Sequence, residues 1–296
     1  MKWLRVLFFC VLISSCTAQT QKPDLKTEES GNTLLWEVTG KDLKSPSYLF
    51  GTFHMLCRDD IRFSPALQSA LGASRELYLE LDMDDPATLI GGMLLMNMKK
   101  DTKLKDLYTP EEYARVERFF KDTLKTPVST LQSMKPFFLV AMLYPKMMPC
   151  KTITGVEEEL MKLARQQKKE VQGLETMAFQ ASIFDSIPYR DQAKELLKTI
   201  DSLDHYKKYF DTMLTVYKEQ RINEMEKLFN DNEMGVEENQ DILLDNRNRN
   251  WVGQLKKIMT KESVFVAVGA GHLPGDNGLI SLLRKEGYTV RAIKNR

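Results

Sequence analysis

The stretch that decides the fold is Ser263-Val264-Phe265-Val266-Ala267-Val268, which runs directly into Gly269-Ala270-Gly271-His272. A nearly continuous apolar run of this kind suits a strand that is buried on both faces, as in a parallel sheet. A helical pattern over 276–286 follows, then a last strand over 288–293. Strand, helix and strand in this order predict a βαβ unit with a right-handed crossover.

A matching sequence lies near the other end of the chain. Tyr48-Leu49-Phe50 is a short apolar strand that leads into Gly51-Thr52-Phe53-His54. A strand over 34–38 precedes it across a polar turn, and residues 76–82 alternate with leucines on one face. The expected fold is therefore α/β: a mixed, largely parallel central sheet surrounded by helices, with paired strand–Gly-x-x-His units at the two ends of the chain.

The first 33 residues are expected to lie outside this fold. Residues 1–15 have a basic start and an apolar run too short to span a bilayer, as in an export signal. Ile13-Ser14-Ser15-Cys16 resembles the lipobox of bacterial lipoproteins, which implies cleavage before Cys16 and lipidation of this cysteine. Ordinary signal cleavage, for example after Ala18, is the alternative. Residues 16–33 are polar and predict a flexible tether.

We therefore expect an exported protein that is lipid-anchored to a bacterial membrane, in the first instance the outer membrane. Its domain, residues 34–296, would lie in the periplasm or at the cell surface. Residues from about 191 to 235 are charged, helical in pattern and free of proline, and predict a helical insertion in that domain.

Two cysteines, Cys57 and Cys150, remain in the domain. Outside the cytoplasm two such thiols can pair, so a disulfide and two free thiols are both open.

The charge balance argues against nucleic acid as a partner. The chain has 42 basic and 41 acidic residues and a formal net charge of +1. Binding to DNA or RNA needs a strongly basic face. The oligomeric state is left open.

The candidate site starts from the scarcity of histidine. The chain has three histidines, and two of them, His54 and His272, end the Gly-x-x-His turns. Ligands of open α/β sheets bind beyond the carboxyl ends of the strands, so both imidazoles are expected at one rim of the sheet. The alternative is that each ring only satisfies backbone groups in a tight turn. His205 lies in a charged helical stretch and is expected at the surface.

Two imidazoles and a carboxylate suit a divalent metal. Glu80 lies near the end of a predicted strand, on its polar face, and is the candidate third group. It would ligate the metal or act as general base on a bound water. This donor set suits manganese, cobalt and zinc, and the sequence does not choose among them.

Three further residues are candidates for the same rim. Glu175 follows a short strand and is a candidate catalytic residue, or else a carboxylate favoured at a helix N-terminus. Arg247 and Asn250 lie three residues apart, so we expect them on one helix face as substrate-binding residues. Arg247 is also a catalytic candidate. The alternative for this pair is a polar anchor between helix and sheet.

These residues resemble the TraB/PrgY/GumN family, which includes the animal Tiki proteins. The resemblance covers about Leu34 to Ile293. It is carried by residues 48–54 and 265–273, with Leu79-Glu80-Leu81-Asp82, Gly173-Leu174-Glu175-Thr176, Gln180 and Arg247-Asn248-Arg249-Asn250-Trp251. It implies a fold similar to that of the erythromycin esterase and ChaN proteins. It also implies a metal-dependent protease site at His54, His272 and Glu80.

Two functions follow as expectations. The first is a metal-dependent hydrolase, most simply a peptidase acting on extracytoplasmic peptides. The alternative is a lipoprotein that binds a peptide or small molecule without turnover, as implied by relatives linked to shutting down pheromone signals. Hydrolysis of a non-peptide ester would rest on fold analogy alone.

Overall fold

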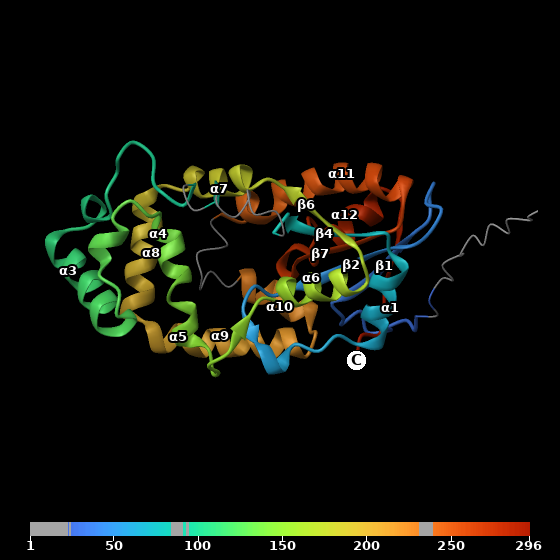
Figure 1. Ribbon diagram of the computed structural model, residues 1–296, viewed down its shortest axis with the longest axis horizontal. Helices are drawn as coiled ribbons and strands as arrows, with labels where there is room; N and C mark the ends of the chain where they lie inside the picture. Colours follow the sequence, from blue (N-terminus) through green and yellow to red (C-terminus); the bar gives the residue numbers. More distant parts are fainter. Residues whose placement is uncertain (1–22, 24, 84–90, 93–94, 231–238) are drawn as a thin grey trace, which may run out of the picture.

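The computed structural model describes residue 23 and residues 25–83, 91–92, 95–230 and 239–296. Its centre is a six-stranded sheet (Figure 1). The strand order is β6 (Glu170–Glu175), β4 (Glu76–Leu81), β7 (Val264–Gly269), β2 (Ser47–Thr52), β1 (Leu35–Thr39), β8 (Thr289–Ala292). The first four are parallel neighbours, whereas β1 is antiparallel to both β2 and β8. Only β1 therefore runs against the others, and the expected mixed, largely parallel sheet is confirmed.

The central strand β7 is apolar on both faces because the sheet separates two cores. Phe265 and Ala267 belong to one core, and Val264, Val266 and Val268 belong to the other. All five are fully buried. The continuous apolar run in the sequence is thus the pattern of a strand covered on both sides.

Helices supply the two covers (Figure 1). On one side, α1 (Pro65–Ala73) and α6 (Val156–Gln166) contribute Leu67, Leu71 and Leu160 to the core that contains Phe265. On the other side, α11 (Asn246–Lys261) and α12 (Leu279–Lys285) contribute Trp251 and Leu283 to the core that contains Val266. The sheet is thus the middle layer between two layers of helices, and this arrangement holds the edge of the sheet where its parallel strands end.

The expected C-terminal strand–helix–strand unit is present, but its two strands are not neighbours in the sheet. β8 is parallel to β7, as a βαβ unit requires, but β2 and β1 lie between them. The chain therefore crosses over two strands through α12 rather than pairing its last strand with β7.

The helical part is larger than the insertion expected at about 191–235. That range contains most of α8 (Tyr189–Asp201), then α9 (Leu203–Lys218) and α10 (Ile222–Asn230), while residues 231–238 lie outside the described part. α3 (Pro110–Phe119) and α4 (Pro136–Ala141) pack against α8, and α5 (Tyr144–Met147) packs against α9. They form one lobe at the left of Figure 1 together with α7 (Met177–Ser186), which leads from the sheet into it. Because α3 and α4 both pack against α8, segments distant in sequence form the lobe.

A disulfide joins this lobe to the chain beyond β2. Cys57 and Cys150 are bonded across a sequence separation of 93 residues. Cys57 lies in the short strand β3 (Leu56–Cys57), which pairs with β5 (Ile153–Thr154). β3 follows the first Gly-x-x-His turn, and β5 precedes α6.

The expectation of a flexible tether over 16–33 is wrong for its second half. Leu25 is buried, Thr27 forms an isolated bridge with Ile293, and the amide of Glu28 donates to the carbonyl of Ala292. The reason is that β8 is an edge strand whose free backbone groups accept a partner, and this segment supplies one. The signal, Cys16 and residues 17–22 lie outside the described residues. Within the described part, no helix is long and apolar enough to cross a membrane.

Candidate functional site

The two Gly-x-x-His turns lie side by side at the carboxyl edge of the sheet. β2 and β7 are parallel neighbours, with Gly51 opposite Val268 and Thr52 opposite Gly269. A Cβ atom on Gly51 would lie 3.0 Å from Cβ of Ala270 and 3.1 Å from Cδ1 of Leu273. The first glycine is therefore needed so that the second turn can pack directly on the first.

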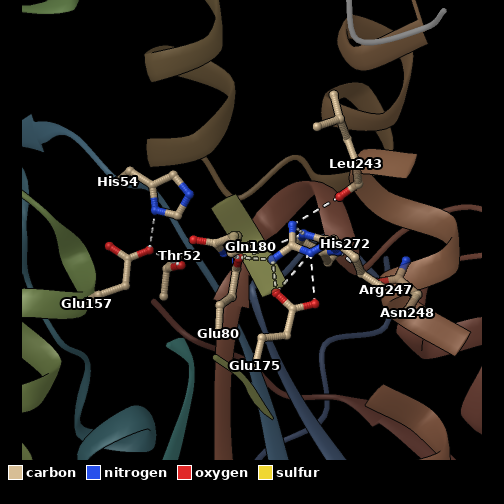
Figure 2. Close-up of polar contacts among 11 residues, drawn as sticks. Thr52, His54, Glu80, Glu157, Glu175, Gln180, Leu243, Arg247, Asn248 and His272 are labelled. Atoms are coloured by element: carbon tan, nitrogen blue, oxygen red, sulfur yellow. Dashed lines mark hydrogen bonds and ion pairs between the residues drawn. The ribbon is translucent and has the colours of Figure 1, made fainter. Parts of the chain in front are cut away.

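Three candidate side chains converge on the second glycine. A Cβ atom on Gly269 would lie 3.2 Å from Oε1 of Glu80, 3.7 Å from Cδ2 of His272 and 3.9 Å from Nε2 of His54. The amide of Gly269 donates to Oε1 of Glu80 at 2.8 Å. The sheet thus brings His54, His272 and Glu80 together around Gly269. Figure 2 shows these three side chains with their polar partners.

His54 reaches this point from the solvent side, where 72% of its side chain is exposed. Its Nδ1 lies 2.8 Å from Oε1 of Glu157, and the Thr52 hydroxyl donates to the same oxygen at 2.5 Å. Glu157 is almost buried in the first turn of α6. Its carboxylate raises the pKa of His54 to about 9. With Nδ1 bonded to Glu157, Nε2 of His54 is the ring nitrogen on the side of Gly269.

His272 is buried and is held in one tautomer. Its Nδ1 lies 2.7 Å from Oδ1 of Asn248. The side-chain amide of Asn248 donates to the carbonyl of Asn277 at 2.9 Å, so Oδ1 must be the acceptor for His272. Nδ1 therefore carries the proton and Nε2 has the lone pair. Burial lowers the pKa of His272 to about 3, which keeps the ring neutral.

Arg247 fills the space between the carboxylates and His272. Its side chain forms ion pairs with Glu80 at 2.6 Å and Glu175 at 2.8 Å. Nε donates to both oxygens of Glu175, Nη2 to Glu80 and Glu175, and Nη1 to the carbonyl of Leu243 and to Nε2 of His272 at 3.1 Å. All five N–H groups are therefore engaged. In this arrangement Arg247 has no donor left for a substrate, contrary to the substrate-binding role expected for it.

Glu80 and Glu175 differ in their electrostatic surroundings. Burial opposes ionisation of Glu80, but the neighbouring His272, Arg247 and His54 outweigh it and lower its pKa to about 2. Burial raises the pKa of Glu175 despite its contact with Arg247. Gln180 from α7 donates to Oε2 of Glu80 at 3.3 Å, which adds a second neutral contact to this carboxylate. Glu80 is thus the ionised, central carboxylate of the site.

Asn250 does not take part in the site, contrary to expectation. It is exposed on α11, whereas Arg247 and Asn248 are buried. The buried face of α11 also contains Trp251, Val252, Leu255 and Met259. Residues 247 and 248 continue that apolar stripe by helical spacing, and residue 250 does not. The apolar periodicity of this helix is the sequence signal that places Asn248, and not Asn250, on the buried face beside the site.

Glu157 is the other site residue that the sequence interpretation missed. It stands in a run of three glutamates at the start of α6, where acidic residues are common. Its role depends on the amide of Val156, which donates to the carbonyl of Phe53 at 3.1 Å and fixes the helix start beside His54. No local sequence pattern predicts this contact.

The charges and donors of the site fit a divalent cation. Glu80 and Glu175 are paired with the single guanidinium of Arg247, and Glu157 is paired with His54. The three carboxylates exceed the charge of Arg247 by two, and the protonated His54 ring offsets one of these negative charges. Both imidazoles have Nδ1 bonded to an acceptor, the arrangement that orients metal-ligating histidines.

The spacing of these groups is wider than a coordination shell. Nε2 of His272 lies 3.8 Å from Oε1 of Glu80, whereas two ligands about 2 Å from one metal stand nearer 3 Å apart. Within the described ranges, no three His, Cys, Asp or Glu side chains are grouped closely enough to hold a metal ion. Binding would therefore require the side chains to close, and Arg247 to give up its contact with Nε2 of His272.

Comparison with known proteins identifies relatives of this chain. The chain is 28% identical over 130 residues to a protein of Xenopus tropicalis named Metalloprotease TIKI2. That match covers 39% of this chain and 24% of the relative, so the chain matches about a quarter of the relative's length. No solved structure matches. The family model for TraB/PrgY/gumN matches residues 34–292, which include every site residue above. The chain belongs to the TraB/PrgY/gumN family.

Proposed function

We propose that this protein is a divalent-cation-dependent hydrolase that acts on peptides outside the cytoplasm. One observation carries the proposal: two histidines, in the turns that follow the adjacent strands β2 and β7, each have Nδ1 held by an acceptor and lie with Glu80 around Gly269. The bonds to Glu157 and Asn248 set both rings in this orientation. Ring orientation by an outer partner is typical of histidines that bind a metal.

His54, His272 and Glu80 would hold the cation, with manganese, cobalt and zinc as the candidates. When bound, a cation would supply Lewis-acid polarisation of the scissile carbonyl. The protein residues do the rest. Glu157 and Asn248 orient the rings, and Arg247 balances the buried carboxylates. Glu80 serves either as a ligand or as the base that takes a proton from the attacking water.

The peptide substrate is supported by the metalloprotease relative and by the polarity of the site. A cavity of about 200 Å³ lies beside the second Gly-x-x-His turn and is lined by Asn248, Gly271 and the carboxylates of Glu226, Asp245 and Asp276. Such a lining offers hydrogen-bond acceptors to the N–H groups of a peptide.

The direct test is cleavage of a mixed peptide library, followed by mass spectrometry, before and after chelation. His54→Ala and His272→Ala are each expected to reduce cleavage at least 100-fold with an unchanged circular dichroism spectrum. His205→Ala is the matched control, because His205 lies on the exposed side of α9. Full activity in both site variants would refute the proposal. Stoichiometric peptide binding without product, unaffected by chelator, would favour the binding function instead.

Glu80→Gln separates the two roles of the carboxylate. Elemental analysis that finds the cation retained in an inactive variant would assign Glu80 as the base. Loss of the cation together with activity would assign it as a ligand. Full activity of Glu80→Gln would remove Glu80 from the chemistry.

We also propose that the protein is lipid-anchored through Cys16 on the outer side of a bacterial inner membrane or at the outer membrane. The disulfide between Cys57 and Cys150 supports an oxidising compartment. Membrane fractionation of the full chain and of Cys16→Ala tests the anchor, and the variant is expected in the soluble exported fraction. A membrane-bound variant would contradict the anchor.

A further inference from the structure

We propose that Arg247 and a divalent cation compete for Nε2 of His272, so that cation binding releases one guanidinium N–H into the site. This inference rests on the proposed function, because it takes His272 as a cation ligand.

The competition follows from the tautomer of His272. Nδ1 carries the proton because Asn248 presents an oxygen to it, so Nε2 has the only ring lone pair. That lone pair accepts an N–H of Arg247 at 3.1 Å. One lone pair serves one partner. A guanidinium at hydrogen-bond distance from this atom would also repel a second cation.

Arg247 can release His272 without leaving the site. Its Nε and Nη2 groups remain bonded to Glu175, and Nη2 also remains bonded to Glu80 through Oε2. The other N–H of Nη1 remains bonded to the carbonyl of Leu243. Its guanidinium lies 4.7 Å from the ring of Trp251. Four of the five N–H groups therefore keep their acceptors when the contact with His272 is lost.

The two carboxylate oxygens of Glu80 have different partners. Oε2 accepts from Arg247, whereas Oε1 accepts from the amide of Gly269 and faces Nε2 of His272 at 3.8 Å. Oε1 is thus the oxygen available for a cation, and the ion pair through Oε2 need not break.

The N–H of Arg247 that is released when a cation replaces it on His272 can bind a substrate. Arg247 is almost buried, so an N–H without an acceptor there is unfavourable. A carbonyl or carboxylate oxygen of a bound peptide would satisfy it. The proposal therefore fixes an order, with the cation first and the substrate oxygen second, and the coupling between the two ligands must be reciprocal.

The primary test observes the wild-type protein by nitrogen-15 NMR while Zn²⁺ is added after chelation. We expect the Nε2 signal of His272 and one Nη signal of Arg247 to move together. The Nε signal of Arg247, bonded to Glu175, and the Nδ1 signal of His272, bonded to Asn248, should keep their positions. Zinc on Nε2 of His272 with all Arg247 signals unchanged would overturn the competition and leave the proposed function intact.

Variants give an independent measure through the Zn²⁺ dissociation constant. Arg247→Ala and Arg247→Lys are expected to bind Zn²⁺ roughly tenfold more tightly than wild type, the effect of removing one charge-assisted hydrogen bond. Arg247→Lys keeps the charge, so a gain there reports the lost bond rather than the lost charge. Arg249→Ala, on the exposed side of the same helix, should leave affinity unchanged.

The outcomes separate the two proposals. Equal or weaker binding by folded Arg247→Lys would overturn the competition. Zinc that reaches His272 in the variants but not in wild type would support the competition and contradict the proposed function of the wild-type chain. Zinc that reaches His272 in none of them would overturn both.

Discussion

Nδ1 of His54 lies 2.8 Å from Oε1 of Glu157, and this contact joins the end of the first Gly-x-x-His turn to the start of α6. It orients an exposed ring through a nearly buried carboxylate. The carboxylate also stabilises the protonated form of His54.

Glu157→Gln should lower the pKa of His54 from about 9 towards its ordinary value of 6.5, because the amide does not stabilise the imidazolium charge. Proton NMR titration of the chelator-treated protein measures this directly, with His205 as the internal reference. An unchanged pKa would show that the ring is not paired with this carboxylate in solution.

The same pair sets a pH dependence of stability. The pKa of His54 is raised in the folded state, so its contribution is fully present below about 6.5 and is lost as pH rises through about 9. The ring is largely exposed, so solvent weakens the effect. Denaturant unfolding of the chelator-treated protein should show a decline over this window in wild type, and a flatter profile in Glu157→Gln. A wild-type profile that rises over the window would contradict the assignment.

Gly51→Ala should destabilise the fold by about 1–3 kcal/mol, because its Cβ would press against Ala270 and Leu273 in a packed region. Gly253→Ala is the matched control. No atom lies within 4 Å of that Cβ, and residue 253 is in the interior of α11, so alanine should stabilise by roughly 0.5–1 kcal/mol. Thermal unfolding of both variants measures the contrast, and similar melting temperatures would contradict it.

Gly269→Ala should affect the site more than the fold. Its Cβ would stand 3.2 Å from Oε1 of Glu80, closer than most carbon contacts, and at ordinary distances from His272 and His54. We expect roughly 10- to 100-fold weaker cation binding from displacement of Glu80, with less loss of stability than in Gly51→Ala. Calorimetric titration with Zn²⁺ decides, and wild-type affinity would show that the three side chains do not share this space.

Removing the disulfide with Cys57→Ser and Cys150→Ser together should cost about 4.6 kcal/mol, as estimated for a closed loop of this length. Guanidinium unfolding of wild type with and without reductant, beside the double variant, measures it. A double variant as stable as the oxidised wild type would mean that the β3–β5 pair alone holds this junction.

Much of the sheet was predictable because its strands have local patterns. A continuous apolar run, as in Val264–Val268, indicates a strand buried on both faces. Alternation, as at Leu77, Leu79 and Leu81, indicates a strand with one buried face. The extent of the helical lobe was not predictable, because α4 and α8 are distant in sequence and their packing against each other has no local pattern. The binding of residues 25–33 to the edge of β8 was missed because backbone pairing at an edge needs no distinctive side chains.

The site was predictable only where its residues repeat a pattern. His54 and His272 were identified from the matching turns, and Glu80 from the polar face of its strand. Glu157 and Asn248 depend on where helices begin and which face they bury. The saturation of Arg247 depends on four partners from different parts of the chain, so no sequence spacing predicts it.

The position of β7 between β4 and β2 has a consequence for how the protein is made. During synthesis, the first 263 residues contain β2 and β4 but not the strand that joins them, so each has an open edge. The second histidine follows that late strand. A nascent chain that has not yet reached residue 272 therefore carries no assembled site, because β2 and β4 are joined only once β7 has entered the middle of the sheet.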